Sequence, residues 1–138
     1  MENGRIAYAG RYSTPDYETI LTADCGLAIE NTMIYHTPEV KEQLERFDIP
    51  VLVERSSYEE DPLARMEWIK LYGLLLGKKE QAEQQFAEAE QRIAPLAEQP
   101  STGKTVAFFS ITSNGLATVR KGNDYVARMI EMAGGDYV

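Results

Sequence analysis

A helical pattern from Pro62 to Ala94 constrains the fold of this chain more than any other feature of its sequence. At 1.5 Å per residue, an unbroken helix of about 33 residues would be about 50 Å long. Such a helix is too long for a small doubly wound domain, so the pattern predicts a spine that bridges two bodies. Gly77 interrupts the pattern and is expected to weaken or kink the helix, because glycine is a poor helix former.

The two halves of this pattern differ in the surface that they bury. Residues 63–76 are apolar on most sides and are expected to be largely buried. After Gly77, apolar residues recur at spacings of three and four, which predicts a single apolar stripe on a charged helix. Pro95 and Pro100 are expected to end this helix. The stripe consists of Ala82, Phe86, Ala89, Ile93 and Leu96.

Three dipeptides in the first half of the sequence predict helix starts. Thr14-Pro15, Thr37-Pro38 and Asp61-Pro62 each place a capping oxygen immediately before a proline. Short apolar runs lie between them and predict buried strands. The alternation of strand and helix predicts a parallel sheet covered by helices, that is, a three-layer, Rossmann-like α/β lobe. The runs are residues 6–9, 27–29 and 51–53.

The pattern changes after residue 100. Residues 105–111 predict a strand, Asn114-Gly115 predicts a hairpin turn, and residues 116–120 predict the returning strand. Residues 124–133 predict an amphipathic helix that Gly134-Gly135 ends.

These patterns predict three segments. They are part of a first α/β lobe at 1–61, a long interlobe helix at 62–97, and the beginning of a second α/β lobe at 98–138.

Composition excludes several classes of protein. The chain carries 14 Lys and Arg against 22 Asp and Glu, a net charge of −8, so we expect no nucleic-acid partner. No apolar run reaches the roughly 18 residues that a membrane-spanning helix needs. Residues 1–4 lack the features of an export signal, which indicates either a cytosolic protein or a chain whose signal has been removed.

The sequence offers little for catalysis or metal binding. Cys25 and His36 are each the single residue of their type, which excludes zinc sites built from cysteines or paired histidines. Residues 101–105 contain Gly-Lys-Thr, which is part of the phosphate-loop motif. The first glycine of that motif is missing, and the segment opens a strand rather than a helix, so we expect no phosphate loop here. Glu59, Glu60 and Asp61 are interpreted as a solvated helix start. We therefore expect neither catalytic residues nor a metal site.

Polar and aromatic side chains follow the predicted strands. In open parallel sheets, ligands bind beyond the carboxyl ends of the strands, and this collar would suit an oxygen-rich small molecule. The candidate ligand-binding residues are Tyr12, Glu30, Asn31, Tyr35, Arg55, Ser57, Tyr58, Ser113 and Asn114. Glu18 lies in the first turn of the first predicted helix, where it could stabilise the helix end or dock a basic partner.

Four segments, in the same order, resemble the solute-binding proteins of ABC importers for iron–siderophores, haem and cobalamin. The resemblance covers residues 14–94 and 104–135. Residues 23–29, before the second strand, depart from the family's pattern. The four segments are residues 15–21, 38–51, 71–82 and 125–135.

The resemblance implies two α/β lobes joined by one long helix, with a metal chelate held between them and delivered to a membrane permease. It implies that Glu18 docks on arginines of the permease, and that the second docking residue lies beyond Val138. It also implies that this chain is about half of the usual protein. The implied location is extracytoplasmic and lipid-anchored, with the signal absent here. No enzymatic activity is implied. The implied ligand is a ferric siderophore, haem or cobalamin, and no cofactor is implied.

Two other functions remain open from the sequence. One is a stand-alone cytosolic, flavodoxin-like α/β module that binds a partner or a nucleotide. The other is an acid–base enzyme that uses Glu30 or Glu54 at a strand end. Because the helical pattern at 62–94 would leave apolar faces uncovered, we also expect self-association, by exchange of that helix between copies.

Overall fold

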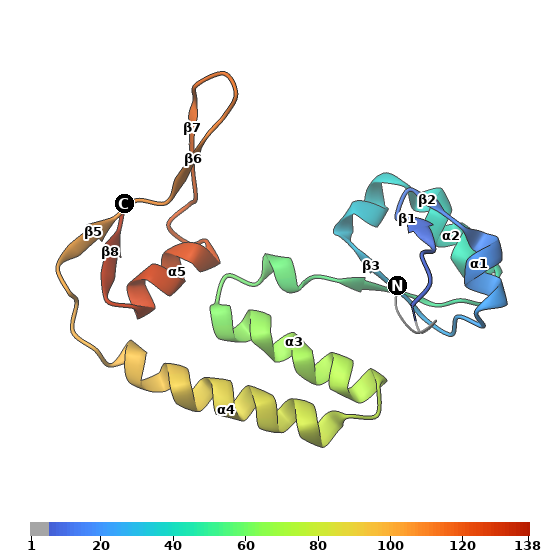
Figure 1. Cartoon of the computed structure of the whole chain (residues 1–138), viewed down its shortest axis with the longest axis horizontal. Helices are drawn as coiled ribbons and strands as arrows, with labels where there is room; N and C mark the ends of the chain where they lie inside the picture. The colour runs from blue at the N-terminus through green and yellow to red at the C-terminus, as the bar shows by residue number, and fades with distance from the viewer. Residues whose placement is uncertain (1–5) are drawn as a thin grey trace. The chain divides into compact units, whose positions relative to one another are not determined.

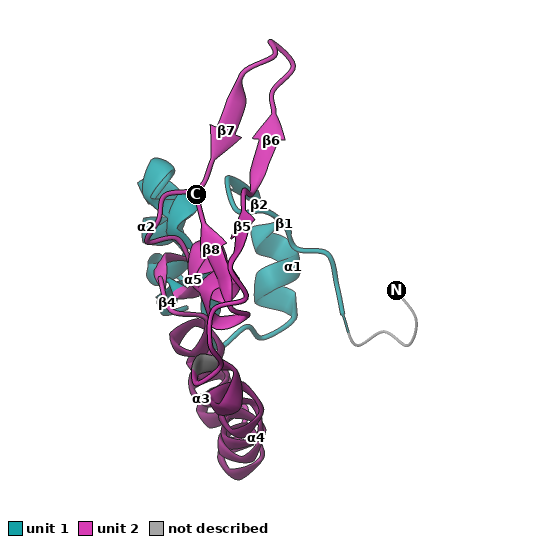
Figure 2. Ribbon diagram, turned by 90° about the vertical axis from the view of Figure 1, so that its left-hand side faces the viewer, with its two compact units in different colours: residues 1–55 teal, residues 56–138 magenta. Residues whose placement is uncertain are grey.

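The computed structural model describes residues 6–138 and divides into two compact units, residues 1–55 and 56–138 (Figures 1 and 2). Each unit contains helices and one pair of parallel strands, so the predicted α/β class is confirmed. Residues 1–5, which include the segment without features of an export signal, lie outside the described residues. Within the described part, no helix is long and apolar enough to cross a membrane.

The first unit is built around two parallel strands. Strand β3 (Ala28–Asn31) pairs with β4 (Val51–Glu54), as the apolar runs predict. The chain passes between them through a 3₁₀ helix, η1 (Thr32–His36), and helix α2 (Pro38–Arg46). The buried core lies under this connection and consists of Ile34, Val40, Leu44 and Ile49.

The beginning of the first unit differs from the prediction. Thr14-Pro15 does not start a helix but forms strand β2 (Thr14–Pro15), antiparallel to β1 (Gly10–Arg11). Helix α1 (Tyr17–Thr22) starts two residues later, because the Asp16 carboxylate accepts a hydrogen bond from the Thr19 amide at 3.1 Å. The strand expected at residues 6–9 is also absent, and the first strand begins at Gly10.

The expected single long helix is wrong. Helix α3 (Pro62–Leu75) ends before Gly77, and α4 (Lys79–Ala97) runs back beside it (Figure 1). Gly77 has a φ of +65°. The amide of Lys78 donates to the Gly73 carbonyl at 2.6 Å and that of Gly77 to the Leu74 carbonyl at 3.2 Å. This is the hydrogen-bond pattern of a Schellman motif, which stops a helix rather than kinking it.

A close contact holds α3 and α4 together. Gly73 and Ala82 are both buried, and a Cβ atom added to Gly73 would collide with the Cβ of Ala82. One turn earlier on α3, the Lys70 ammonium lies 3.9 Å from the centre of the Phe86 ring. Pro95 lies inside α4 and does not end it, contrary to the prediction.

The second unit continues with a parallel strand pair and a hairpin. Strand β5 (Lys104–Val106) pairs with β8 (Gly135–Tyr137), while β6 (Phe109–Ile111) and β7 (Ala117–Val119) form an antiparallel hairpin. The strand expected at 105–111 is therefore divided between two sheets.

The predicted hairpin turn and last helix are confirmed. Gly115 has a φ of +81°, and the Thr112 amide donates to the Leu116 carbonyl at 2.9 Å across the turn. Helix α5 (Tyr125–Met132) is capped by Asp124, whose carboxylate accepts from the Val126 amide at 2.9 Å.

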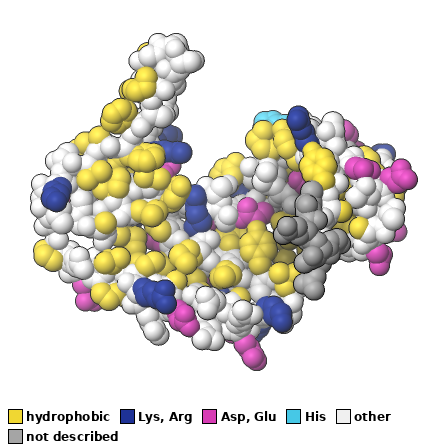
Figure 3. All heavy atoms as spheres, in the orientation of Figure 1, with side chains coloured by type: hydrophobic (Ala, Val, Ile, Leu, Met, Phe, Trp, Pro, Cys, Tyr) yellow, Lys and Arg dark blue, Asp and Glu magenta, His cyan; other side chains and the backbone are white. Residues whose placement is uncertain are grey.

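Many apolar side chains lie at the surface of the second unit, over the hairpin and the helices (Figure 3). Leu74 and Leu76, at the end of α3, are 63% and 74% exposed. Self-association of the chain stays a prediction.

We predict that Gly73→Ala destabilises the second unit by about 1–2 kcal/mol. Forcing a methyl group into a packed site typically costs more than the roughly 1 kcal/mol that alanine gains by its helix propensity. Urea unfolding followed by circular dichroism measures the change. The double variant Gly73→Ala/Ala82→Gly should recover most of the loss, because it reopens the gap. Gly26→Ala, where no atom beyond the two neighbouring residues lies within 4 Å of the new methyl, is the control.

We predict that two helix-cap variants differ in their effect on stability. Asp61 accepts from the amides of Leu63 and Ala64 at 2.8 and 3.2 Å, so Asp61→Ala should cost about 1 kcal/mol. Thr37 precedes α2 without a side-chain cap bond, and its buried hydroxyl has no partner among the described residues. Thr37→Ala should therefore be close to neutral in the same unfolding experiment. Equal losses in the two variants would contradict this assignment.

Candidate functional site

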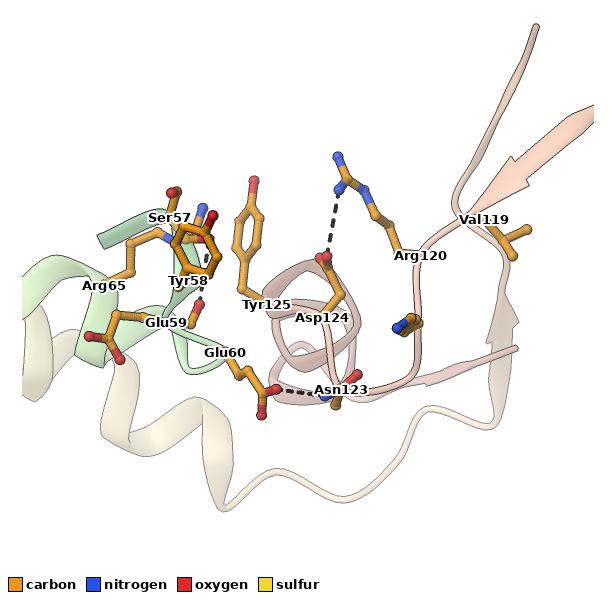
Figure 4. A pocket seen from close by; sticks show the side chains of 11 residues that line it. Ser57, Tyr58, Glu59, Glu60, Arg65, Val119, Arg120, Asn123, Asp124 and Tyr125 are labelled. Atoms are coloured by element: carbon orange, nitrogen blue, oxygen red, sulfur yellow. Dashed lines mark hydrogen bonds and ion pairs between the residues drawn. The ribbon is translucent and has the colours of Figure 1, made fainter. Parts of the chain in front are cut away.

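A cavity of about 400 Å³ lies within the second unit, between the beginnings of α3 and α5 (Figure 4). Two segments that are distant in sequence form its walls. We call residues 57–60 the first wall and residues 119–125 the second wall. Its lining consists of Ser57, Tyr58, Glu59, Glu60, Arg65, Val119, Arg120, Lys121, Asn123, Asp124 and Tyr125.

Each wall leads into a helix that an aspartate caps. The first wall includes the 3₁₀ helix η2 (Ser56–Tyr58) and precedes Asp61, the cap of α3. The second wall follows the hairpin and contains Asp124, the cap of α5. Because a cap fixes the direction in which the chain enters its helix, both loops are held at a defined angle.

Arg65, on the first turns of α3, contacts both walls. Its Nη2 atom donates to the carbonyl of Ser57 at 2.8 Å and approaches that of Glu59 at 3.4 Å. The centre of its guanidinium lies 3.6 Å from the centre of the Tyr125 ring, which is a cation–π contact.

The carboxylates of the first wall are already engaged. Glu59 accepts a hydrogen bond from the Trp68 indole at 3.0 Å. Glu60 accepts one from the side-chain amide of Asn123 at 2.6 Å, which Figure 4 shows as a dashed line. These bonds hold the first wall to α3 and to the second wall, so Glu59 and Glu60 have a structural role beyond the solvated helix start that the sequence indicates.

The second wall carries two exposed cations. Arg120 lies 3.6 Å from the carboxylate of Asp124, and its carbonyl accepts from the Tyr137 hydroxyl at 2.8 Å. The Lys121 side chain is exposed at the same rim. Guanidinium and ammonium groups beside tyrosine rings suit an anionic molecule with flat or unsaturated parts. Among residues 6–138, no group of three His, Cys, Asp or Glu side chains could hold a metal ion.

The structure brings together two of the nine residues predicted to bind ligand. Ser57 and Tyr58 line the cavity. Ser113 and Asn114 lie in the tip of the β6–β7 hairpin and do not line it.

The other five belong to the first unit. Tyr12 lies between β1 and β2, Glu30 and Asn31 end β3, Tyr35 lies in η1, and Arg55 follows β4. The Asn31 side chain accepts from the Met33 amide at 2.8 Å and so caps η1. Ligand binding by all nine residues stays a prediction.

Sequence reasoning missed Arg65 and all of the second wall as parts of a binding site. The rule that ligands bind beyond strand ends directs attention to the first residues after each strand. Arg120 and Lys121 do follow a strand, β7, but it belongs to an antiparallel hairpin, to which the rule for parallel sheets does not apply. Asn123 precedes the cap of α5, and Glu59 and Glu60 precede the cap of α3. Polar and charged residues immediately before an Asp cap were the available signal.

Three acidic residues of the first unit are singled out by the sequence, namely Glu18, Glu30 and Glu54, and Glu54 is the last residue of β4. Glu18 is exposed in the first turn of α1, and its docking role stays a prediction. Glu30 lies at the end of β3, where burial raises the pKa of its carboxyl above the ordinary 4.5.

The sequence matches no protein-family model and no curated protein sequence. Its fold, however, is similar to that of solved ABC-type binding proteins. One is an ABC transporter substrate-binding protein from Listeria monocytogenes EGD-e, with 15% identity and a TM-score of 0.66 over 96% of this chain and 50% of that chain. Another is the periplasmic heme-binding protein RhuT from Roseiflexus sp. RS-1, with 23% identity and a TM-score of 0.68 over 96% and 50%.

A third similar structure is a possible iron-binding, periplasmic solute-binding protein from Staphylococcus epidermidis ATCC 12228. It has 13% identity and a TM-score of 0.69, over 91% of this chain and 49% of that chain. This chain therefore shares the fold of these proteins and spans about half of their length.

We predict that Glu30 makes stability depend on pH. A carboxyl whose pKa is raised by folding binds its proton more tightly in the folded state, so stability falls as pH rises from 4.5 through the raised pKa. Glu30→Gln removes this contribution. The variant should be at least as stable as the unaltered chain at about pH 8, and the difference should shrink towards about pH 4. Urea unfolding at both pH values measures it, and a difference that is the same at the two values would contradict the prediction.

Proposed function

We propose that this chain is part of the extracytoplasmic substrate-binding component of an ABC importer. In this proposal it captures an iron–siderophore-like or other metal-chelate ligand and delivers it to a membrane permease. The fold that it shares with the solved binding proteins supports the class of protein. A lipid anchor at the cell surface, or a periplasmic location, is part of the same proposal.

The observation that carries the proposed ligand class is the composition of the cavity. Arg120 and Lys121 offer exposed positive charge at one wall, and Tyr58 and Tyr125 offer aromatic rings. A chelate supplies all the ligands of its metal, so the protein has to recognise only the organic surface. Arginine binds carboxylate and other anionic oxygens through paired hydrogen bonds, and tyrosine packs against flat groups.

Three chelate classes fit this chemistry. Ferric siderophores, haem and cobalamin each combine a bulky body with oxygen-rich or anionic groups. Ligand pockets typically have volumes of about 300–1,000 Å³, and the cavity of the second unit, about 400 Å³, lies in this range. One similar structure is described as heme-binding and another as iron-binding, which favours an iron chelate.

The proposed docking residue for the permease is Glu18. Its carboxylate lies in the exposed first turn of α1, where a basic side chain of a partner could approach it. The same carboxylate also lies near the positive end of the helix, so the two roles are compatible.

We predict that the chain binds at least one metal chelate in a saturable way. Trp68 is the single tryptophan and its indole donates to Glu59 of the first wall, so its fluorescence should report on the cavity. Haemin, cyanocobalamin, and the ferric complexes of a catecholate and a hydroxamate siderophore are the probes. We expect quenching with a Kd of about 1 μM or tighter for one of them. Quenching that does not saturate with any probe would contradict the proposal.

A matched pair of arginine variants tests the site. Arg120→Ala should weaken binding of that probe about ten- to hundredfold, because hydrogen bonds to charged groups contribute about 1.5–3 kcal/mol. Arg46→Ala is the control, since Arg46 makes a similar exposed ion pair, 3.8 Å from Glu42, in the first unit. Equal affinities in the two variants would place the ligand elsewhere.

A further inference from the structure

The two walls of the cavity come from segments about 60 residues apart in the sequence, so something must hold them at a fixed separation. The walls belong to loops, and loops that lack such a tie vary in position. One tie is the hydrogen bond between Glu60 and Asn123 at 2.6 Å, which lies among exposed side chains. The second tie runs through Arg65.

Arg65 belongs to neither wall but touches both. On one side its guanidinium is fixed by carbonyl oxygens of the first wall, at 2.8 Å from Ser57 and 3.4 Å from Glu59. On the other side it lies over the Tyr125 ring of the second wall, at 3.6 Å. Figure 4 shows Arg65 beside the first wall and Tyr125 facing it from the beginning of α5.

The position of this guanidinium carries a cost. Its Nε–H group is buried and has no acceptor among the described residues. A buried donor without a partner is unfavourable, because it loses its hydrogen bonds to water. The carbonyl bonds and the ring contact must offset this loss, which indicates that the guanidinium is held in place by the walls themselves.

We propose that Arg65 is a positioning residue that joins the two walls, so that the cavity is formed before a ligand arrives. A preformed site loses less conformational freedom on binding. In this arrangement Arg65 does not bind the ligand; Arg120 and Lys121 supply the charge for that. The benefit to chelate binding rests on the proposed function, whereas the joining of the walls does not.

Lysine cannot replace Arg65 in this role. The planar guanidinium bonds to carbonyls in its plane and stacks on a ring with its face at the same time. An ammonium group is a compact charge without a face, so it can satisfy one wall or the other. Charge alone is therefore not the property that joins the walls.

Hydrogen exchange of the 138-residue chain without ligand tests the proposal. The Glu59 amide donates to the Ser56 carbonyl at the first wall, and the Asp124 amide donates to the Lys121 carbonyl at the second wall. We expect Arg65→Ala and Arg65→Lys each to speed exchange of both amides about tenfold. Arg128→Ala is the control, because Arg128 pairs with Glu131 on the exposed side of α5 and does not line the cavity.

Two results would overturn the proposal. One is unchanged exchange at Asp124 in Arg65→Ala, since the second wall would then be held without Arg65. The other is an equal acceleration at the Thr102 and Val138 amides, which bond within the β5–β8 region, because this would indicate general destabilisation.

A spectroscopic signature provides an independent readout. Stacking on Tyr125 should shift the Arg65 guanidinium proton resonances upfield by the ring current, and Tyr125→Leu should abolish that shift. A shift that persists in Tyr125→Leu would contradict the joining role. Absence of chelate binding together with these expected results would refute the proposed function alone.

Discussion

The left-handed turn at Gly77 is the constraint on which the second unit depends. At a φ of +65°, the chain reverses in three residues, and α4 returns along α3 instead of continuing away from it. Any residue with a side chain is disfavoured in this conformation. The reversal is then fixed by the contact of Gly73 with Ala82, where the absence of a side chain on α3 lets the helices approach closely. The helical hairpin thus carries the first wall at the beginning of α3, while the second wall leads into α5.

The cavity follows from how two loops enter their helices. Asp61 and Asp124 each accept hydrogen bonds from amides of the first turn that follows, so the preceding loops cannot swing freely. Arg65 lies one turn beyond the first cap, which places its guanidinium back over the loop that leads into α3. Tyr125 directly follows the second cap, Asp124, and the centre of its ring lies 3.6 Å from the Arg65 guanidinium. The site is therefore built from two loops that run from a strand end, after β4 or β7, to a capped helix start.

The sequence predicts the elements of this fold better than their connections. Strands β3 and β4, the Gly115 hairpin and α5 are all recoverable, because apolar runs, an Asn-Gly pair and an Asp cap each have one favoured local structure. The sequence shows a glycine at position 77, but a glycine within a helical pattern can either kink the helix or end it. The hydrogen bonds of Lys78 and Gly77 show that it ends the helix. Thr14 failed as a cap because Asp16, two residues later, competes for the same role.

The site was harder to predict because it depends on contacts between distant residues. No pattern in the sequence relates Arg65 to Tyr125, which are 60 residues apart, and neither follows a strand directly. Ser57 and Tyr58 were found because they do follow β4. The charged groups of the cavity differ in their partners. The carboxylates of Glu59 and Glu60 accept hydrogen bonds from side chains of the protein. The cations at the rim of the second wall are exposed, and Arg120 is paired only with Asp124 at 3.6 Å among the ion pairs described, so an anionic ligand can reach both Arg120 and Lys121.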